Sequence, residues 1–67
     1  MNLGDLVKVT VDNTELNGDS IDYLGKIIGK NTTKNTFGVS IEGLGKVLWL
    51  ESGDNEVDKS TVTLGTL

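Results

Sequence analysis

The sequence predicts a small all-β domain, built as a barrel of five short strands. Five apolar runs fill most of the 67-residue chain, at residues 6–11, 23–28, 37–41, 46–50 and 61–64. Gly, Asn or Asp closes each run, and these residue types are the ones that make tight turns. No run is long enough for a substantial helix, and proline is absent, so Gly, Asn, Asp and Ser must supply every turn.

The first two runs show where the predicted barrel bends. Val7, Val9 and Val11 alternate with polar residues, which is the period of a strand with one buried face. A long acidic loop, residues 12–22, follows this strand. The second run continues to Lys30 and includes Gly25 and Gly29, and glycine inside a strand is typical of a bulge or of the sharp bend that a small barrel needs.

The remaining runs complete the expected order of elements. Residues 31–35 predict a hairpin loop, and the apolar side chains of the third run alternate cleanly. The fourth run is apolar on both faces, so it is either covered on both sides or exposes an apolar patch. Residues 51–55 predict a turn, and residues 57–60 predict a single 3₁₀ turn before the last strand.

The predicted core combines apolar positions from all five runs. Trp49, the only tryptophan, is assigned to it as the main packing residue of a small core. The alternative is that Trp49 or Tyr23 lines an exposed groove with Leu48 and Leu50. The core expected from the sequence consists of Val7, Val9, Val11, Ile28, Phe37, Val39, Ile41, Val47, Trp49, Val62 and Leu64.

Size and composition predict one non-enzymatic domain over residues 1–67. A chain of this length buries only about 60% of its unfolded surface, and such a barrel has no interior room for a substrate. Cysteine and histidine are both absent, which removes disulfides, thiolate catalysis, zinc modules and the usual nucleophile–base pairs. We therefore expect no catalytic residues, no cofactor and no metal.

The sequence also predicts a cytoplasmic protein without membrane contact. No apolar stretch approaches the ~20 residues that a membrane-spanning helix needs. Residues 1–5 have neither the basic region nor the apolar segment of a secretory signal.

Three stretches resemble SH3-like small barrels. Residues 3–9 are similar to the Gly-Asp-x-Val-x-Val opening of bacterial SH3-like, KOW and Tudor-type domains. Residues 24–28 resemble the Gly-x-Ile/Val segment of KOW and CAP-Gly domains, and residues 37–41 resemble the Gly-Val-x-Leu strand of CAP-Gly domains. The resemblance implies a single SH3-like barrel. The single-domain size and the polar surface rich in Asn, Thr and Lys favour a phage or small bacterial accessory protein.

The chain departs from the binding motifs of these families. It lacks the Ala-Leu-Tyr-Asp-Tyr motif and the paired tryptophans of signalling SH3 domains, so binding of proline-rich peptides is not expected. It also lacks the CAP-Gly loop, and its net charge of −4 is unlike that of basic ribosomal KOW domains. The resemblance therefore predicts a fold and no particular partner.

Contact with another protein is the leading functional hypothesis. The acidic first loop, the aromatic ring that follows it and the apolar fourth run offer charged and large apolar groups of the kind that form interfaces. The predicted partner-binding residues are Glu15, Asp19, Asp22, Tyr23, Leu48 and Leu50.

Two alternatives from other classes remain open. One is nucleic-acid contact through a lysine stripe beside an aromatic ring that stacks a base. The negative net charge and the absence of arginine disfavour it. This lysine stripe would consist of Lys26, Lys30, Lys34 and Lys46. The second alternative is an inhibitor that presents carboxylates to a DNA-binding protein in place of phosphates.

Two apparent ligand motifs fail on spacing. An EF-hand register that begins in loop 12–22 places Leu24 at its last position, where calcium needs a bidentate glutamate. Residues 38–44 contain the two glycines of a P-loop, but Leu44 stands where the lysine belongs.

Overall fold

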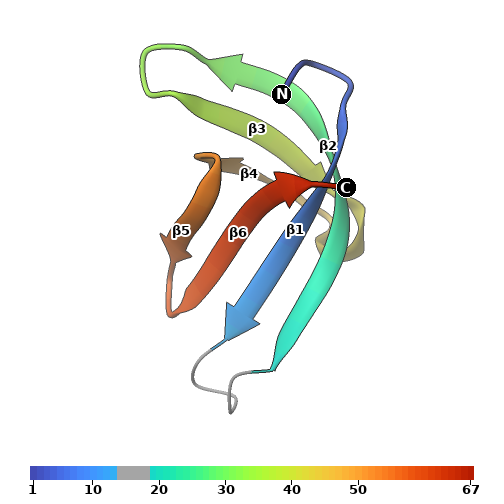
Figure 1. The fold of residues 1–67 in the computed structure, drawn as a ribbon, viewed down its shortest axis with the longest axis vertical. Helices are drawn as coiled ribbons and strands as arrows, with labels where there is room; N and C mark the ends of the chain where they lie inside the picture. Colours follow the sequence, from blue (N-terminus) through green and yellow to red (C-terminus); the bar gives the residue numbers. More distant parts are fainter. Residues whose placement is uncertain (14–18) are drawn as a thin grey trace.

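The chain forms one antiparallel sheet that curls into a half-barrel (Figure 1). The computed structural model describes residues 1–13 and 19–67. Within them lie six strands and one 3₁₀ turn, so the all-β prediction is confirmed and the count of five strands is wrong. The elements are β1 (Leu6–Asn13), β2 (Ser20–Asn31), β3 (Thr36–Ile41), the 3₁₀ turn η2 (Glu42–Leu44), β4 (Lys46–Leu50), β5 (Gly53–Val57) and β6 (Ser60–Thr66).

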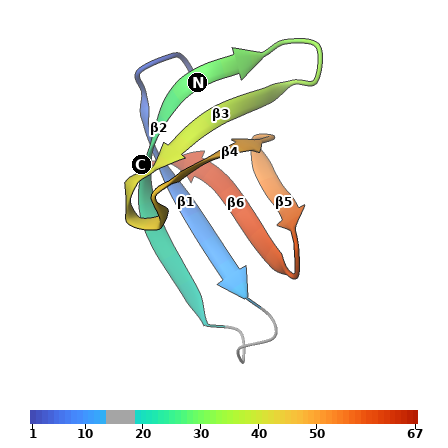
Figure 2. The same ribbon diagram turned by 180° about the vertical axis from the view of Figure 1, so that it is seen from behind.

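The long strand β2 joins the two halves of the sheet. Its first part pairs with β1 and its last part with β3, in a strand order of β4-β3-β2-β1-β6-β5. Figure 2 shows β3 and β4 crossing over the layer made by β1, β6 and β5. A Cβ on Gly25 would lie 2.7 Å from Cγ1 of Val39 and 3.2 Å from Cγ2 of Val9. Glycine therefore lets the two layers approach closely where β2 bends, as its position in the sequence predicts.

The core lies on the concave face of the half-barrel. Most of the predicted core is confirmed, and Val11 is half-buried against it. The buried side chains are Val7, Val9, Ile27, Phe37, Val39, Ile41, Leu50, Val62 and Leu64.

Three predicted core residues are instead exposed. Ile28, Val47 and Trp49 keep 51%, 44% and 56% of their surface in contact with solvent. Their chain neighbours Ile27 and Leu50 are each 1% exposed and take their places in the core. The predicted core is therefore wrong at these three positions.

A β-bulge explains the error on β2. Ile27 pairs with Val39, but the next pair joins Gly29 to Gly38, so Ile28 is an extra residue without a partner on β3. A bulge of this kind reverses the alternation of faces along the strand. Before the bulge the odd-numbered residues of β2 face the core, and after it Lys30 lies opposite the buried Phe37.

The register of β4 against β3 explains the second error. Leu48 lies opposite Val39, and Leu50 lies opposite Phe37, both of which are buried. Directly opposed residues share one face of an antiparallel pair, so Leu48 and Leu50 face the core. Trp49 lies opposite Gly38 and faces outward.

The segment between β4 and β6 also differs from the prediction. Strand β5 (Gly53–Val57) begins inside the turn that the sequence predicts at residues 51–55, and the 3₁₀ turn lies at Glu42–Leu44 rather than at residues 57–60. Asp58 and Lys59 connect β5 to β6 in a tight turn, with Asp58 at φ 55°. Aspartate tolerates this left-handed conformation better than most residues.

Candidate functional site

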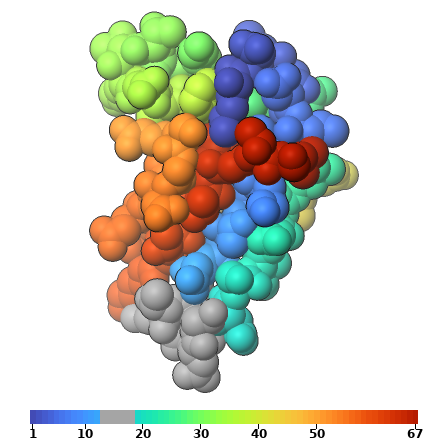
Figure 3. Space-filling model, viewed as in Figure 1, coloured from blue at the N-terminus to red at the C-terminus, as the bar shows by residue number. Residues whose placement is uncertain are grey.

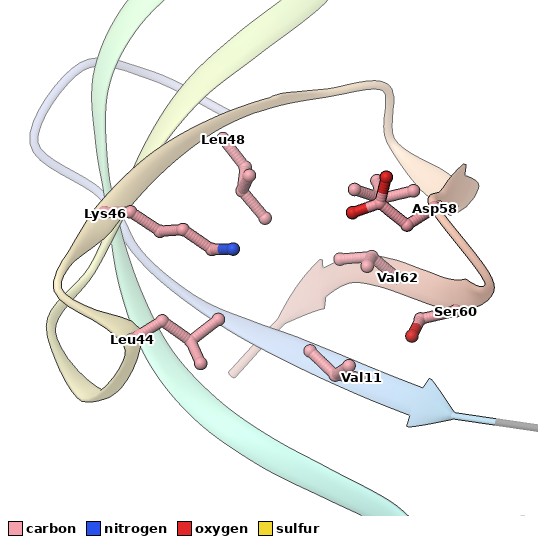
Figure 4. A pocket seen from close by; sticks show the side chains of 8 residues that line it. Val11, Leu44, Lys46, Leu48, Asp58, Ser60 and Val62 are labelled. Atoms are coloured by element: carbon pink, nitrogen blue, oxygen red, sulfur yellow. The ribbon is translucent and has the colours of Figure 1, made fainter. Parts of the chain in front are cut away.

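An apolar groove lies on the open side of the half-barrel, between β4 and the β5–β6 hairpin (Figure 4). Its volume is about 150 Å³. Aliphatic side chains form most of its wall, and one cation and one carboxylate stand on opposite sides of it. The lining residues are Val11, Leu44, Lys46, Leu48, Val57, Asp58, Ser60 and Val62.

The groove exists because the half-barrel does not close. Strands β4 and β5 are the two edges of the sheet, and each is paired on one side only. Leu48 on β4 and Val57 on β5 are half-buried and pack against the core from opposite walls. The 3₁₀ turn adds Leu44, and Gly45 at φ 64° ends that turn by donating to the carbonyls of Ile41 and Glu42.

The side chain of Asn55 fixes the connection between the two walls. Its Oδ1 accepts a hydrogen bond from the backbone N–H of Glu51 at 2.8 Å. Its Nδ2 donates to the carbonyls of Glu51, Gly53 and Val62, at 2.9, 3.1 and 3.2 Å. Asn55 thus acts as an extra backbone unit that ties the end of β4 to β5 and β6. The sequence does not reveal this role, because asparagine within a short polar strand has the same signature as asparagine in a turn.

The predicted partner-binding residues do not form one surface. Leu48 lies in the groove, whereas Leu50 is buried in the core and cannot belong to an exposed patch. Asp22 is exposed and accepts a hydrogen bond from Thr10 Oγ1 at 2.8 Å.

The structure describes two of the other three predicted partner-binding residues. Tyr23 is half-buried and packs against Gly43, where a Cβ would meet its ring at 2.6 Å. Asp19 is exposed, and Glu15 lies outside the described residues.

The four lysines of the expected stripe are also dispersed. Lys26 lines a shallow hollow with Leu6 and Leu24, and Lys46 lines the groove on the other face of the sheet. Lys30 holds its ammonium group 5.7 Å from the centre of the Phe37 ring. Lys34 lies in the β2–β3 hairpin loop. The structure therefore does not gather these lysines into one stripe.

Residues 1–13 and 19–67 lack two further features. No three His, Cys, Asp or Glu side chains in these residues lie together as metal ligands. No helix in this part of the chain is long and apolar enough to cross a membrane. Five of the twelve residues of the calcium register, 14–18, lie outside the described part of the chain.

Comparison of the chain with protein-family models, with curated protein sequences and with solved structures finds no significant match in any of the three. The SH3-like resemblance therefore stays a sequence-based prediction. The function has to be inferred from the surface of this chain.

Proposed function

We propose that the protein is a non-enzymatic binding module that holds an extended segment of another protein in the groove between β4 and the β5–β6 hairpin. We also propose that the half-barrel is an SH3-like barrel with an open side. The resemblance of residues 3–9, 24–28 and 37–41 supports this fold assignment, together with the small curled antiparallel sheet.

The observation that carries the functional proposal is an apolar groove flanked by both edges of the sheet. An edge strand presents unpaired N–H and C=O groups that an extended peptide can pair with. Apolar side chains of such a peptide would enter the space between Leu44, Leu48 and Val57. Main-chain pairing gives affinity in this mode, and the side-chain pockets give specificity.

The charges in the groove define the partner further. Lys46 extends into the groove from β4, and Asp58 lies on the opposite wall (Figure 4). A bound segment would place an acidic side chain toward Lys46 and a basic or polar one toward Asp58. We therefore propose a partner segment that combines one aliphatic side chain with a neighbouring carboxylate.

Peptide selection tests this proposal. Peptides selected from a random display library on the wild-type protein should shift the amide NMR signals of Val11, Leu48 and Val57. Leu44→Asp should weaken their binding by at least about tenfold, because it puts a charge into the apolar contact. Leu24→Asp, at an exposed leucine outside the groove, is the matched control and should bind normally.

Equal binding by the two variants would contradict the groove as the site. Amide shifts confined to residues outside the groove would contradict it as well. Far-UV circular dichroism of both variants confirms that each is folded before binding is compared.

A further inference from the structure

The ring of Trp49 packs against two glycines on the outer face of the sheet, away from the groove. Gly29, Gly38 and Trp49 form one row across β2, β3 and β4. The indole Cη2 lies 2.8 Å from the position that a Cβ would take on Gly29, and 3.0 Å from that on Gly38. The six-membered ring therefore rests on the backbone of both glycines. With 56% of its surface exposed, the indole leaves its other side open to a ligand.

Polar groups surround the exposed indole. A hollow of about 350 Å³ is lined by Trp49, Asn31, Lys34 and Thr36. The Oδ1 atom of Asn31 accepts a hydrogen bond from the backbone N–H of Lys34 at 3.1 Å. That bond orients the amide and leaves its Nδ2 available to donate. The hollow thus offers an aromatic face, a cation, an amide donor and a hydroxyl.

Charge is segregated within this acidic protein. Residues 23–41 contain three lysines and no carboxylate, although the whole chain carries a net charge of −4. They form most of β2, the hairpin loop and β3, and the hairpin lies at one end of the molecule (Figure 3). Of the three lysines, Lys34 is the one that lines the hollow beside Trp49. A cation beside an exposed ring attracts an anionic group even where the net charge of the protein is negative.

We propose that Trp49 stacks a base of single-stranded nucleic acid, while Lys34 contacts an adjacent phosphate. Asn31 and Thr36 face the edge of the stacked base. Aromatic side chains next to cations are the usual means of holding unpaired strands, because every base presents a π-face. A ring that rests on a sheet face can receive only an unstacked base, so a duplex is not the ligand. This site is independent of the groove and of its peptide.

Oligonucleotide binding at low salt tests the proposal. Trp49 is the only tryptophan, so quenching of its fluorescence by oligothymidylate or oligouridylate reports on the site directly. Binding of either polymer supports the proposal, and the ratio of the two affinities shows whether the ribose 2′-hydroxyl contributes. The affinity should fall steeply with salt, with a slope of about −0.7 in log–log form per phosphate contacted.

Variants are compared by the anisotropy of a dye-labelled oligonucleotide, since Trp49→Ala removes the intrinsic signal. Trp49→Ala should weaken binding about 5- to 150-fold, as expected for the loss of one stacked base, and Trp49→Phe should recover part of that loss. Lys34→Glu should weaken binding and flatten the salt slope. Lys8→Glu makes the same charge change on β1, outside the hollow, and should have a smaller effect.

Two results would overturn the proposal. One is that neither polymer quenches the fluorescence of Trp49 at low salt. The other is binding that Lys34→Glu and Lys8→Glu weaken equally and that Trp49→Ala leaves unchanged. Lys34 lies in an exposed loop, so its variant tests the site even if Trp49→Ala destabilises the sheet.

Discussion

Ile27→Ala should remove most of the free energy of unfolding, whereas Ile28→Ala should change it little. Ile27 is fully buried in the core, and Ile28 is an exposed bulge residue. Truncating a buried isoleucine to alanine costs about 2–5 kcal/mol, because it removes buried surface and leaves a cavity. A 67-residue chain has a total stability of about 3–10 kcal/mol. An exposed truncation usually changes stability by less than about 0.5 kcal/mol.

The pair is well matched because the residues are adjacent, chemically identical and in the same strand. Any loss of β-propensity is therefore similar in the two variants. Urea unfolding followed by far-UV circular dichroism gives both midpoints, and an unchanged slope shows that the stability itself has changed. If the midpoint of Ile28→Ala fell as far as that of Ile27→Ala, the bulge and the assigned core face would be wrong.

The strands that sequence alone predicts well are those with one polar and one apolar face. In β1, the valines alternate with lysine and threonine, so only one register can bury them. The same holds for β3, where Phe37, Val39 and Ile41 are all buried as expected. When only one face of a strand is buried, the alternation of apolar and polar residues fits a single register.

The strands with two apolar faces could not be resolved by pattern. On β2, the apolar pair Ile27–Ile28 fits either face, and only the bulge opposite β3 decides between them. On β4, the outward position of Trp49 depends on two glycines that lie 11 and 20 residues earlier in the chain. Such contacts are non-local, so no local period reveals them.

The candidate sites were the least predictable feature. The groove combines residues from β1, η2, β4, β5 and β6, and of the predicted partner-binding residues that the structure describes only Leu48 contributes to it. Strand β5 is polar except for Val57, which is why the sequence predicts a turn there. The bulge at Ile28 places Lys26 and Lys30 on opposite faces of β2, and Lys46 lines the groove, so these lysines do not form a stripe.

Asn55→Asp should lower the stability by about 3 kcal/mol, although the two side chains have the same shape. A carboxylate can still accept the hydrogen bond from the Glu51 N–H, but it cannot donate to the carbonyls of Glu51, Gly53 and Val62. It would place a negative oxygen against those carbonyl oxygens. Strand β5 would then lose the link that holds it to the end of β4.

Ser52→Asp is the matched control for this substitution. It adds the same negative charge to the same connection, but at an exposed position, so its effect should stay below about 0.5 kcal/mol. Urea midpoints of the two variants separate the lost hydrogen bonds from the added charge. Equal midpoints would show that the amide of Asn55 does not stabilise the connection between β4 and β5. A selective loss for Asn55→Asp would show that one polar side chain sets the spacing between the two walls of the groove.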